Sequence, residues 1–177
     1  MNSTQRIVYF GILTSLGLAL HIIEGFIPNP FMGIVPGAKI GLANIIGLMA
    51  LVLFGLRFAL AVNMMRVFMA GMLTGAVTSM LYGLAGAFLS TLLMWMALHF
   101  LNHLLSLVGV SVLGALGHNV AQLSVAGLMI QNIRIFVYLP FMMFASIFTG
   151  IFIGLTAYFV LQKVKNRFAD TAYSLTS

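Results

Sequence analysis

The residues best suited to chemistry in this chain are a few polar and charged side chains set within long apolar stretches. His21 and Glu24 are three positions apart and His118 and Gln122 are four apart, so each pair is expected to share one helix face. Ionisable groups are costly inside a membrane and commonly face a cavity or a partner helix. We therefore predict that one ligand site is formed by His21, Glu24, Lys39, Asn44, Arg66, His118, Asn119 and Gln122.

Structural roles are the alternative for several of these residues. Glu24 could pair with Lys39 or His21 at the membrane surface, and the lysine could simply extend to water. Asn119 and His118 could join neighbouring helices through hydrogen bonds. For Arg66 a cavity-facing role is favoured, because it lies far from both ends of its apolar segment.

The composition excludes several kinds of catalysis. Glu24 and Asp170 are the only acidic residues, and there is no cysteine. Prenyl diphosphate synthesis needs clustered aspartates to hold magnesium on the diphosphate, which two distant acids cannot supply. Disulfides, iron–sulfur ligation and thiolate zinc sites are excluded, and no Walker-type phosphate loop is present. We expect no enzyme activity, cofactor or metal.

The elements that hold the polar side chains must lie in lipid. Of the 177 residues, 62% are apolar and 6% are charged, whereas soluble domains carry roughly a quarter charged residues. This composition predicts an integral membrane protein. The net charge of +6 comes from scattered single bases, which favours a role in membrane orientation over nucleic-acid binding.

The apolar pattern predicts an all-α bundle of about six transmembrane helices, since each span needs about 20 residues and fewer inside a bundle. We expect them at residues 7–27, 40–54, 58–74, 79–100, 108–130 and 136–162. The stretch 28–44 holds three prolines, which predicts a folded loop presenting Lys39 and Asn44 to a cavity, or an ordinary connector. Residues 1–162 would form one domain and 163–177 a cytoplasmic tail.

Six spans put both termini on the same side of the membrane. That side then carries five bases, and the other side carries two: Arg6, Arg57, Lys163, Lys165 and Arg167 against Lys39 and Arg134. Cytoplasmic loops are enriched in Lys and Arg. We therefore predict a bacterial inner-membrane protein with cytoplasmic termini.

Small residues recur at helix-contact spacing. Gly11, Ser15 and Ala19 are four apart in the first span, and similar pairs occur at Gly71 and Gly75 and at Gly150 and Gly154. Such spacing lets helix backbones approach closely in lipid. Packing within this chain is the favoured explanation, and docking of a partner membrane subunit is the alternative.

Three sequence strings resemble one bacterial family, known as heptaprenyl diphosphate synthase component I or the Gx transporter family. They are PGAKIGLANI at 36–45, GLAG at 83–86 with Ser90, and SVLGALGHNVAQ at 111–122. The family name implies a subunit of a long-chain prenyl synthase. Since the residues argue against catalysis, the resemblance implies an accessory role at most.

The size, the six spans and the cytoplasmic termini also resemble the substrate-binding S components of energy-coupling factor (ECF) transporters. That resemblance implies capture of a small ligand from outside and docking on a shared transmembrane subunit with two ATPases. The stripe Gly11, Ser15 and Ala19 loosely matches the docking pattern of the first helix in those proteins.

Two functions are therefore expected as alternatives. In the first, the chain binds a small polar or anionic ligand, with charge from Lys39 and Arg66 and orientation by Asn44, Asn119 and Gln122. In the second, it is a non-transporting accessory subunit of polyprenyl or quinone side-chain synthesis.

Overall fold

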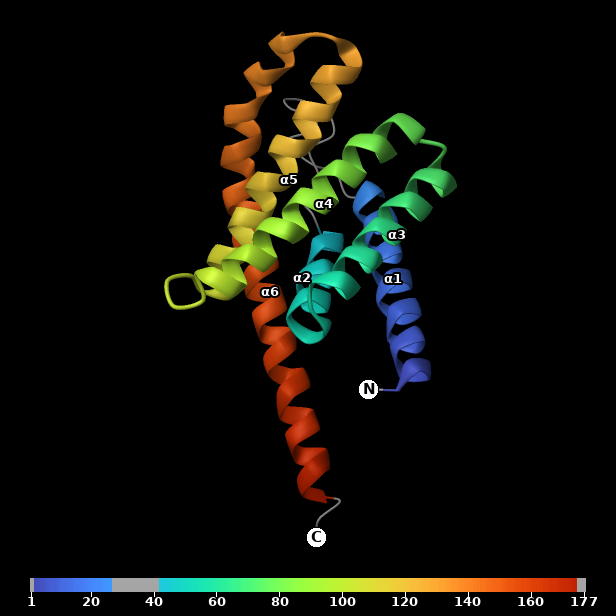
Figure 1. Cartoon of the computed structure of the whole chain (residues 1–177), viewed down its shortest axis with the longest axis vertical. Helices are drawn as coiled ribbons and strands as arrows, with labels where there is room; N and C mark the ends of the chain where they lie inside the picture. Colours follow the sequence, from blue (N-terminus) through green and yellow to red (C-terminus); the bar gives the residue numbers. More distant parts are fainter. Residues whose placement is uncertain (1, 27–41, 175–177) are drawn as a thin grey trace.

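The described part of the chain is entirely helical, as the sequence predicts. The computed structural model describes residues 2–26 and 42–174, with side chains through residue 164. The helices are α1 (Ser3–Phe26), α2 (Leu42–Phe54), α3 (Leu56–Thr74), α4 (Val77–Phe100), α5 (Leu107–Ile130), η1 (Ile133–Tyr138) and α6 (Leu139–Ser174) (Figure 1). Lys39 and most of the predicted 28–44 loop lie outside the described residues.

Most helix ends fall within a few residues of the predicted ones, and two ends differ more. Asn44 belongs to the first turn of α2 and not to the loop before it. A 3₁₀ turn, η1, occupies the predicted start of the sixth span, and α6 continues to Ser174 instead of ending near 162. The last turns of α6 project from the bundle (Figure 1).

The turns that join the helices have local causes. Gly55 connects α2 and α3 with φ of 83°, and Gly75 ends α3 with φ of 68°. Both angles lie in the left-handed region, which glycine adopts without a Cβ penalty. Ser106 precedes α5, where its hydroxyl accepts a hydrogen bond from the Gly109 N–H at 3.3 Å, a normal N-cap.

Five of the helices are long and apolar enough to cross a membrane, and α2 is the shorter sixth. With 13 residues, α2 extends about 20 Å, less than a hydrocarbon core of about 30 Å. It is also more enclosed than α3, because eight of its 13 residues are buried, against eight of the 19 residues of α3. It contacts α1, α3, α4 and α6, and thus forms the centre of the bundle.

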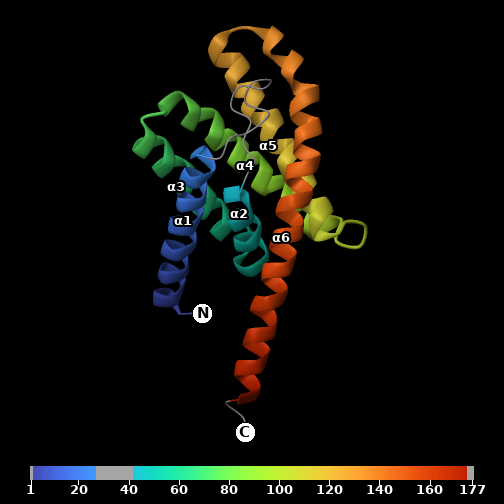
Figure 2. The same ribbon diagram turned by 180° about the vertical axis from the view of Figure 1, so that it is seen from behind.

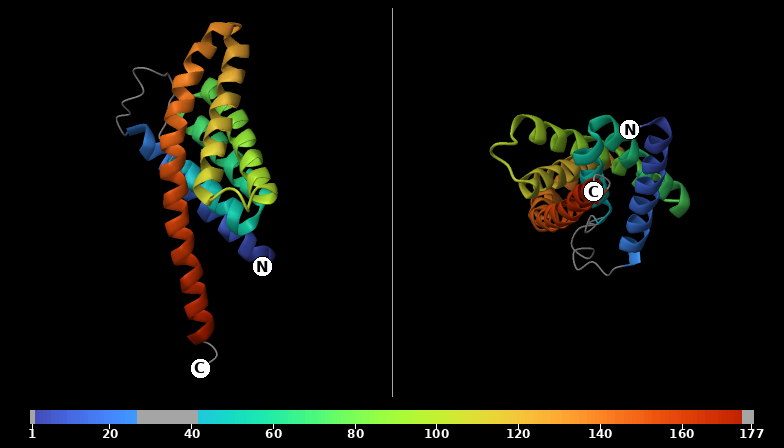
Figure 3. Two further views of the ribbon diagram at one scale, coloured as in Figure 1. Left: turned by 90° about the vertical axis from the view of Figure 1, so that its left-hand side faces the viewer. Right: turned by 90° about the horizontal axis from the view of Figure 1, so that it is seen from below.

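The remaining helices surround α2 in two groups. α1 packs on α2 and α3 at one edge, while α4, α5 and α6 pack in sequence on the other side (Figures 2 and 3). Large apolar side chains such as Phe144, Phe148 and Ile151 point outward, as expected where lipid is the solvent. Both termini lie at the same end of the molecule (Figure 1).

The glycines at predicted helix contacts fall into two classes. A Cβ built on Gly150 or Gly154 would lie 2.6 Å from the Cα of Val112 or Val108, respectively, so these glycines permit backbone contact between α5 and α6. By contrast, Gly11, Ser15 and Ala19 are exposed on α1. A Cβ built on Gly11 would have no described atom within 4 Å, so α1 makes no close packing contact at this residue.

Candidate functional site

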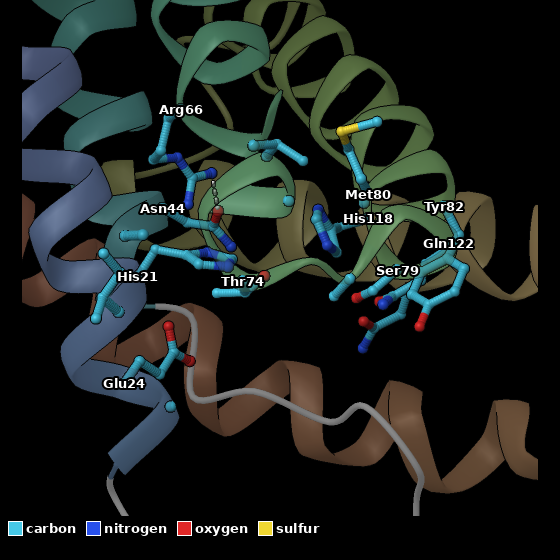
Figure 4. A pocket seen from close by; sticks show the side chains of 18 of the residues that line it. His21, Glu24, Asn44, Arg66, Thr74, Ser79, Met80, Tyr82, His118 and Gln122 are labelled. Atoms are coloured by element: carbon cyan, nitrogen blue, oxygen red, sulfur yellow. Dashed lines mark hydrogen bonds between the residues drawn. The ribbon is translucent and has the colours of Figure 1, made fainter. Parts of the chain in front are cut away.

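The site is a partly open cavity of about 410 Å³ lined by the helices around the start of α2 (Figure 4). Its volume lies within the range of roughly 300–1,000 Å³ that is typical of small-molecule sites. All six α-helices contribute lining residues, from Ile22 of α1 to Ile153 of α6. The cavity is therefore a product of the whole bundle.

Seven of the eight predicted site residues line this one cavity. They are His21, Glu24, Asn44, Arg66, His118, Asn119 and Gln122; the eighth, Lys39, lies outside the described residues. The four helices that carry them are separated in sequence by up to about a hundred positions. The structure thus supplies the shared space that the deep polar residues were predicted to need, whereas ligand binding itself stays a prediction.

Arg66 is the most deeply placed charge. Only 3% of its surface is exposed, and its Nη2 donates a hydrogen bond to Asn44 Oδ1 at 3.2 Å. Its buried Nε has no hydrogen-bond partner within the described residues. Since guanidinium groups carry five N–H donors, Arg66 retains capacity to bind an acceptor in the cavity.

Gly17 of α1 makes room for this arginine. A Cβ at Gly17 would lie 2.8 Å from Arg66 Cδ and 3.7 Å from Ile46 Cβ. The missing side chain allows the arginine stem to cross between α1 and α2. Glu24 lies about two turns further along α1. It is 5% exposed and within Coulombic range of the guanidinium.

Glycine also accommodates His118. A Cβ at Gly86 of α4 would lie 2.8 to 2.9 Å from three atoms of the His118 ring, so the imidazole packs directly on the backbone of α4. Gln122 follows one turn later on α5 and lines the same cavity. The two residues share a face, as their spacing predicts.

Asn119 is engaged with a neighbouring helix. Its Nδ2 donates to the Met142 carbonyl at 3.1 Å and also to the Ser146 hydroxyl. Ser146 in turn donates to the Met142 carbonyl at 2.7 Å. These contacts match the helix-joining alternative for Asn119, although the residue also lines the cavity.

A second buried polar pair lies beside the site and not in it. Asn63 Nδ2 donates to Thr91 Oγ1 at 2.8 Å, and Thr91 donates to the Ala87 carbonyl at 2.7 Å. The amide of Asn63 packs against Gly47 of α2. This pair joins α3 to α4 and packs on α2, and neither residue lines the cavity.

Sequence reasoning missed four polar residues of the wall: Thr74, Ser79, Tyr82 and Thr149. The spacing of Ser79 and Tyr82 places both on one helix face, and Tyr82 immediately precedes the GLAG string. This spacing and position could have identified Ser79 and Tyr82 as candidate site residues from the sequence. Hydroxyl side chains are common in apolar helices, so their presence alone did not distinguish them.

The polar groups are distributed unevenly around the wall. His21, Glu24, Asn44 and Arg66 gather on the side next to α1, whereas Ser79, Tyr82 and Gln122 lie on the opposite side (Figure 4). Among the described lining residues, the first group contains the Lys, Arg, Asp or Glu side chains, which are Glu24 and Arg66, and the second contains neutral hydrogen-bonding groups. Within the described residues, no three potential metal ligands from His, Asp or Glu come together.

Comparison with models of known families shows which family the chain belongs to. A family model described as heptaprenyl diphosphate synthase component I matches residues 13–160. The chain belongs to this family. Neither the curated proteins nor the solved structures contain a match to the chain.

The residues that match the component I family include most of the bundle and every described residue that lines the cavity. The family assignment agrees with the resemblance in the three sequence strings. Together with several long apolar helices, it identifies the chain as a multi-pass membrane protein of this family.

Proposed function

We propose that this protein is the ligand-binding membrane subunit of a transporter, comparable to an S component, which captures a small polar or anionic molecule. The supporting observation is that seven polar residues chosen from sequence line one cavity. A bundle stabilised only by scattered polar contacts has no need for this convergence, because each contact could form at a separate helix interface.

Arg66 and Asn44 would form the recognition centre. Their mutual hydrogen bond orients the guanidinium, and a preorganised donor binds a ligand acceptor with little loss of conformational entropy. Gln122 and Asn119 would add hydrogen bonds from α5. His21, Glu24 and His118 would complete the wall, and Lys39 would add a second cation.

Energy for transport would come from a partner. The sequence holds no phosphate-binding loop, so a separate ATPase module with a transmembrane subunit is required. The exposed stripe of Gly11, Ser15 and Ala19 on α1 is the proposed docking surface, since small residues permit close helix approach in lipid.

We propose that the cavity faces the outside and that the termini are cytoplasmic. Both termini lie at the same end of the bundle, and η1, which carries Arg134, lies at the other end (Figure 1). Arg6 lies near the start of α1, Arg57 lies at the start of α3, and Lys163 lies in the later part of α6, and these parts of the three helices are on the same side of the bundle as the termini (Figure 1). This distribution of bases favours a bacterial inner-membrane protein of that orientation.

Ligand binding by the purified full-length protein tests the site. The protein would be extracted in detergent, and its native mass spectrum would reveal retained small molecules. In the variant Arg66→Gln we expect the retained ligand to fall by at least about tenfold, the effect of removing a buried charged contact. Arg57→Gln is the matched control, because Arg57 is exposed in the first turn of the same helix.

Thermal unfolding of both variants would separate binding from folding. If Arg66→Gln unfolds, Asn44→Ala removes the partner of the guanidinium and serves as the second test. Equal ligand retention by wild type, Arg66→Gln and Asn44→Ala would refute the assignment of this cavity.

The family description favours one other function. A component I of a heptaprenyl diphosphate synthase would act as a non-catalytic membrane accessory subunit beside a soluble, aspartate-rich synthase. Copurification from a native source distinguishes the proposals. Recovery of a prenyl synthase without ATPase subunits would support the accessory role and contradict the transporter role.

A further inference from the structure

Arg66 is held at the cavity by one hydrogen bond to a neighbouring helix. The residue belongs to α3, and its Nη2 donates to Asn44 Oδ1 of α2 at 3.2 Å (Figure 4). That distance is at the long end of the range for an N–H···O hydrogen bond. A small displacement of the arginine stem would therefore remove the contact that orients the guanidinium.

A third helix, α1, determines where the arginine stem can lie. Gly17 is buried on the side of α1 that packs against α2 and α3. A Cβ built on Gly17 would lie 2.8 Å from Arg66 Cδ, 3.6 Å from Arg66 Cγ and 3.7 Å from Ile46 Cβ. Carbon atoms pack best at about 3.5–4.0 Å, so only the contact with Arg66 Cδ is too short. The steric conflict of a methyl group at this position would therefore fall on the arginine.

The contact at Gly17 differs in kind from the contact at Gly150 of α6. A Cβ built on Gly150 would lie 2.6 Å from the Cα of Val112, so a methyl group there must displace a helix backbone. At Gly17 the three nearest atoms all belong to side chains, and the long stem of Arg66 can rotate away. We therefore expect a methyl group at Gly17 to move Arg66 and to leave the helices in place.

We infer that Gly17 is a positioning residue for the ligand site: because it has no side chain, α1 can hold the guanidinium of Arg66 at Asn44. Gly17 does not itself line the cavity, so it acts on the ligand only through the arginine. This inference rests on the proposed ligand-binding function. It adds that a residue of α1 outside the cavity sets the affinity for the ligand.

The test uses the full-length protein in detergent with a small-molecule extract of bacterial cells as the probe. Retained compounds are eluted after washing and quantified by mass spectrometry. Gly17→Ala should retain about threefold to tenfold less than wild type, the effect of losing one oriented hydrogen bond. Its midpoint of thermal unfolding should stay within about 4 °C of the wild-type value. Gly11→Ala is the matched control on the same helix, because a Cβ at Gly11 has no described atom within 4 Å, and it should retain the wild-type amount.

Removal of the arginine stem separates a positioning role from a structural one. In an Arg66→Ala background the atoms that would meet the methyl group are absent, so adding Gly17→Ala should cause no further loss of ligand and should raise the unfolding midpoint. Three results would each overturn the inference alone: equal retention by Gly17→Ala and wild type, a midpoint of Gly17→Ala lowered by more than about 4 °C, or a further loss of ligand in the double variant. Retention of no compound by the wild-type protein would instead refute the proposed ligand-binding function, and this inference with it.

Discussion

The contact between α5 and α6 at Gly154 gives the sharpest stability prediction. A Cβ at this position would lie 2.6 Å from Val108 Cα, 3.1 Å from Ser111 Cβ and 3.3 Å from the Leu107 carbonyl oxygen. Carbon atoms pack best at about 3.5–4.0 Å. Two of these three atoms are backbone, so no side-chain rotation can relieve the overlap. Gly154→Ala must push the two helices apart by roughly 1 Å.

The expected magnitude follows from two opposing effects. Overpacking a close-packed interface costs about 1–3 kcal/mol, and alanine stabilises a helix interior by about 1 kcal/mol relative to glycine. The net loss is therefore up to about 2 kcal/mol. In a chain of this size, a loss of about 2 kcal/mol would lower the midpoint of thermal unfolding by about 4–8 °C, and a smaller loss would lower it proportionately less.

Gly11→Ala is the matched control. Gly11 lies in the interior of α1, and nothing would contact its added Cβ within 4 Å. Only the helix-propensity gain remains, so we expect an unchanged midpoint or a rise of up to about 4 °C. The single tryptophan, Trp95 of α4, provides an intrinsic fluorescence signal for both variants in detergent.

Comparing the unfolding midpoints of the two variants tests whether α5 and α6 are in backbone contact at Gly154. A midpoint for Gly154→Ala equal to or above that of Gly11→Ala would show that α5 and α6 do not meet backbone to backbone at this glycine. The packing of the cavity wall formed by these helices would then need revision.

Two further predictions concern the buried polar pair and the topology. Thr91→Val removes the acceptor of the 2.8 Å hydrogen bond from Asn63 and should lower the free energy of unfolding by about 1–3 kcal/mol. Thr156→Val, on the outside of α6, is the control and should lower it much less. Equal unfolding midpoints for the two variants would contradict the buried pair. Because the chain has no cysteine, Asn2→Cys and Asn132→Cys can each be labelled alone in intact cells. An impermeant thiol reagent should label only Asn132→Cys, and the reverse pattern would overturn the proposed orientation.

The fold class followed from sequence because helix formation in lipid is a local property. Apolar runs of sufficient length must satisfy their backbone groups internally, which makes them helices wherever they pack. Gly55 could likewise be recognised as a helix boundary. Gly75 was predicted from its spacing with Gly71 to make a helix contact, but it ends α3 in the left-handed conformation, and no described atom lies within 4 Å of a Cβ built there. The length of α6 was underestimated, since polar residues beyond 162 end the apolar run but not the helix.

The choice of site residues followed from the cost of burying polar groups, but their individual roles did not. Asn119 and Gln122 look equivalent in sequence, yet Asn119 donates to Met142 and Ser146 of α6. Ser79 and Tyr82 were overlooked, although both line the cavity. A helical pattern fixes which residues share a face, not which helix that face meets.

The sequence by itself determined that this is a helical membrane protein. It also indicated that Arg66 and the other deep polar residues need a shared cavity that keeps them out of lipid. Only the tertiary structure decided that these residues meet in a cavity at the start of α2 and that Gly17 and Gly86 make room for Arg66 and His118. The reason is physical: the cost of burying a charge depends on the residue, whereas its compensation depends on contacts between segments far apart in the chain.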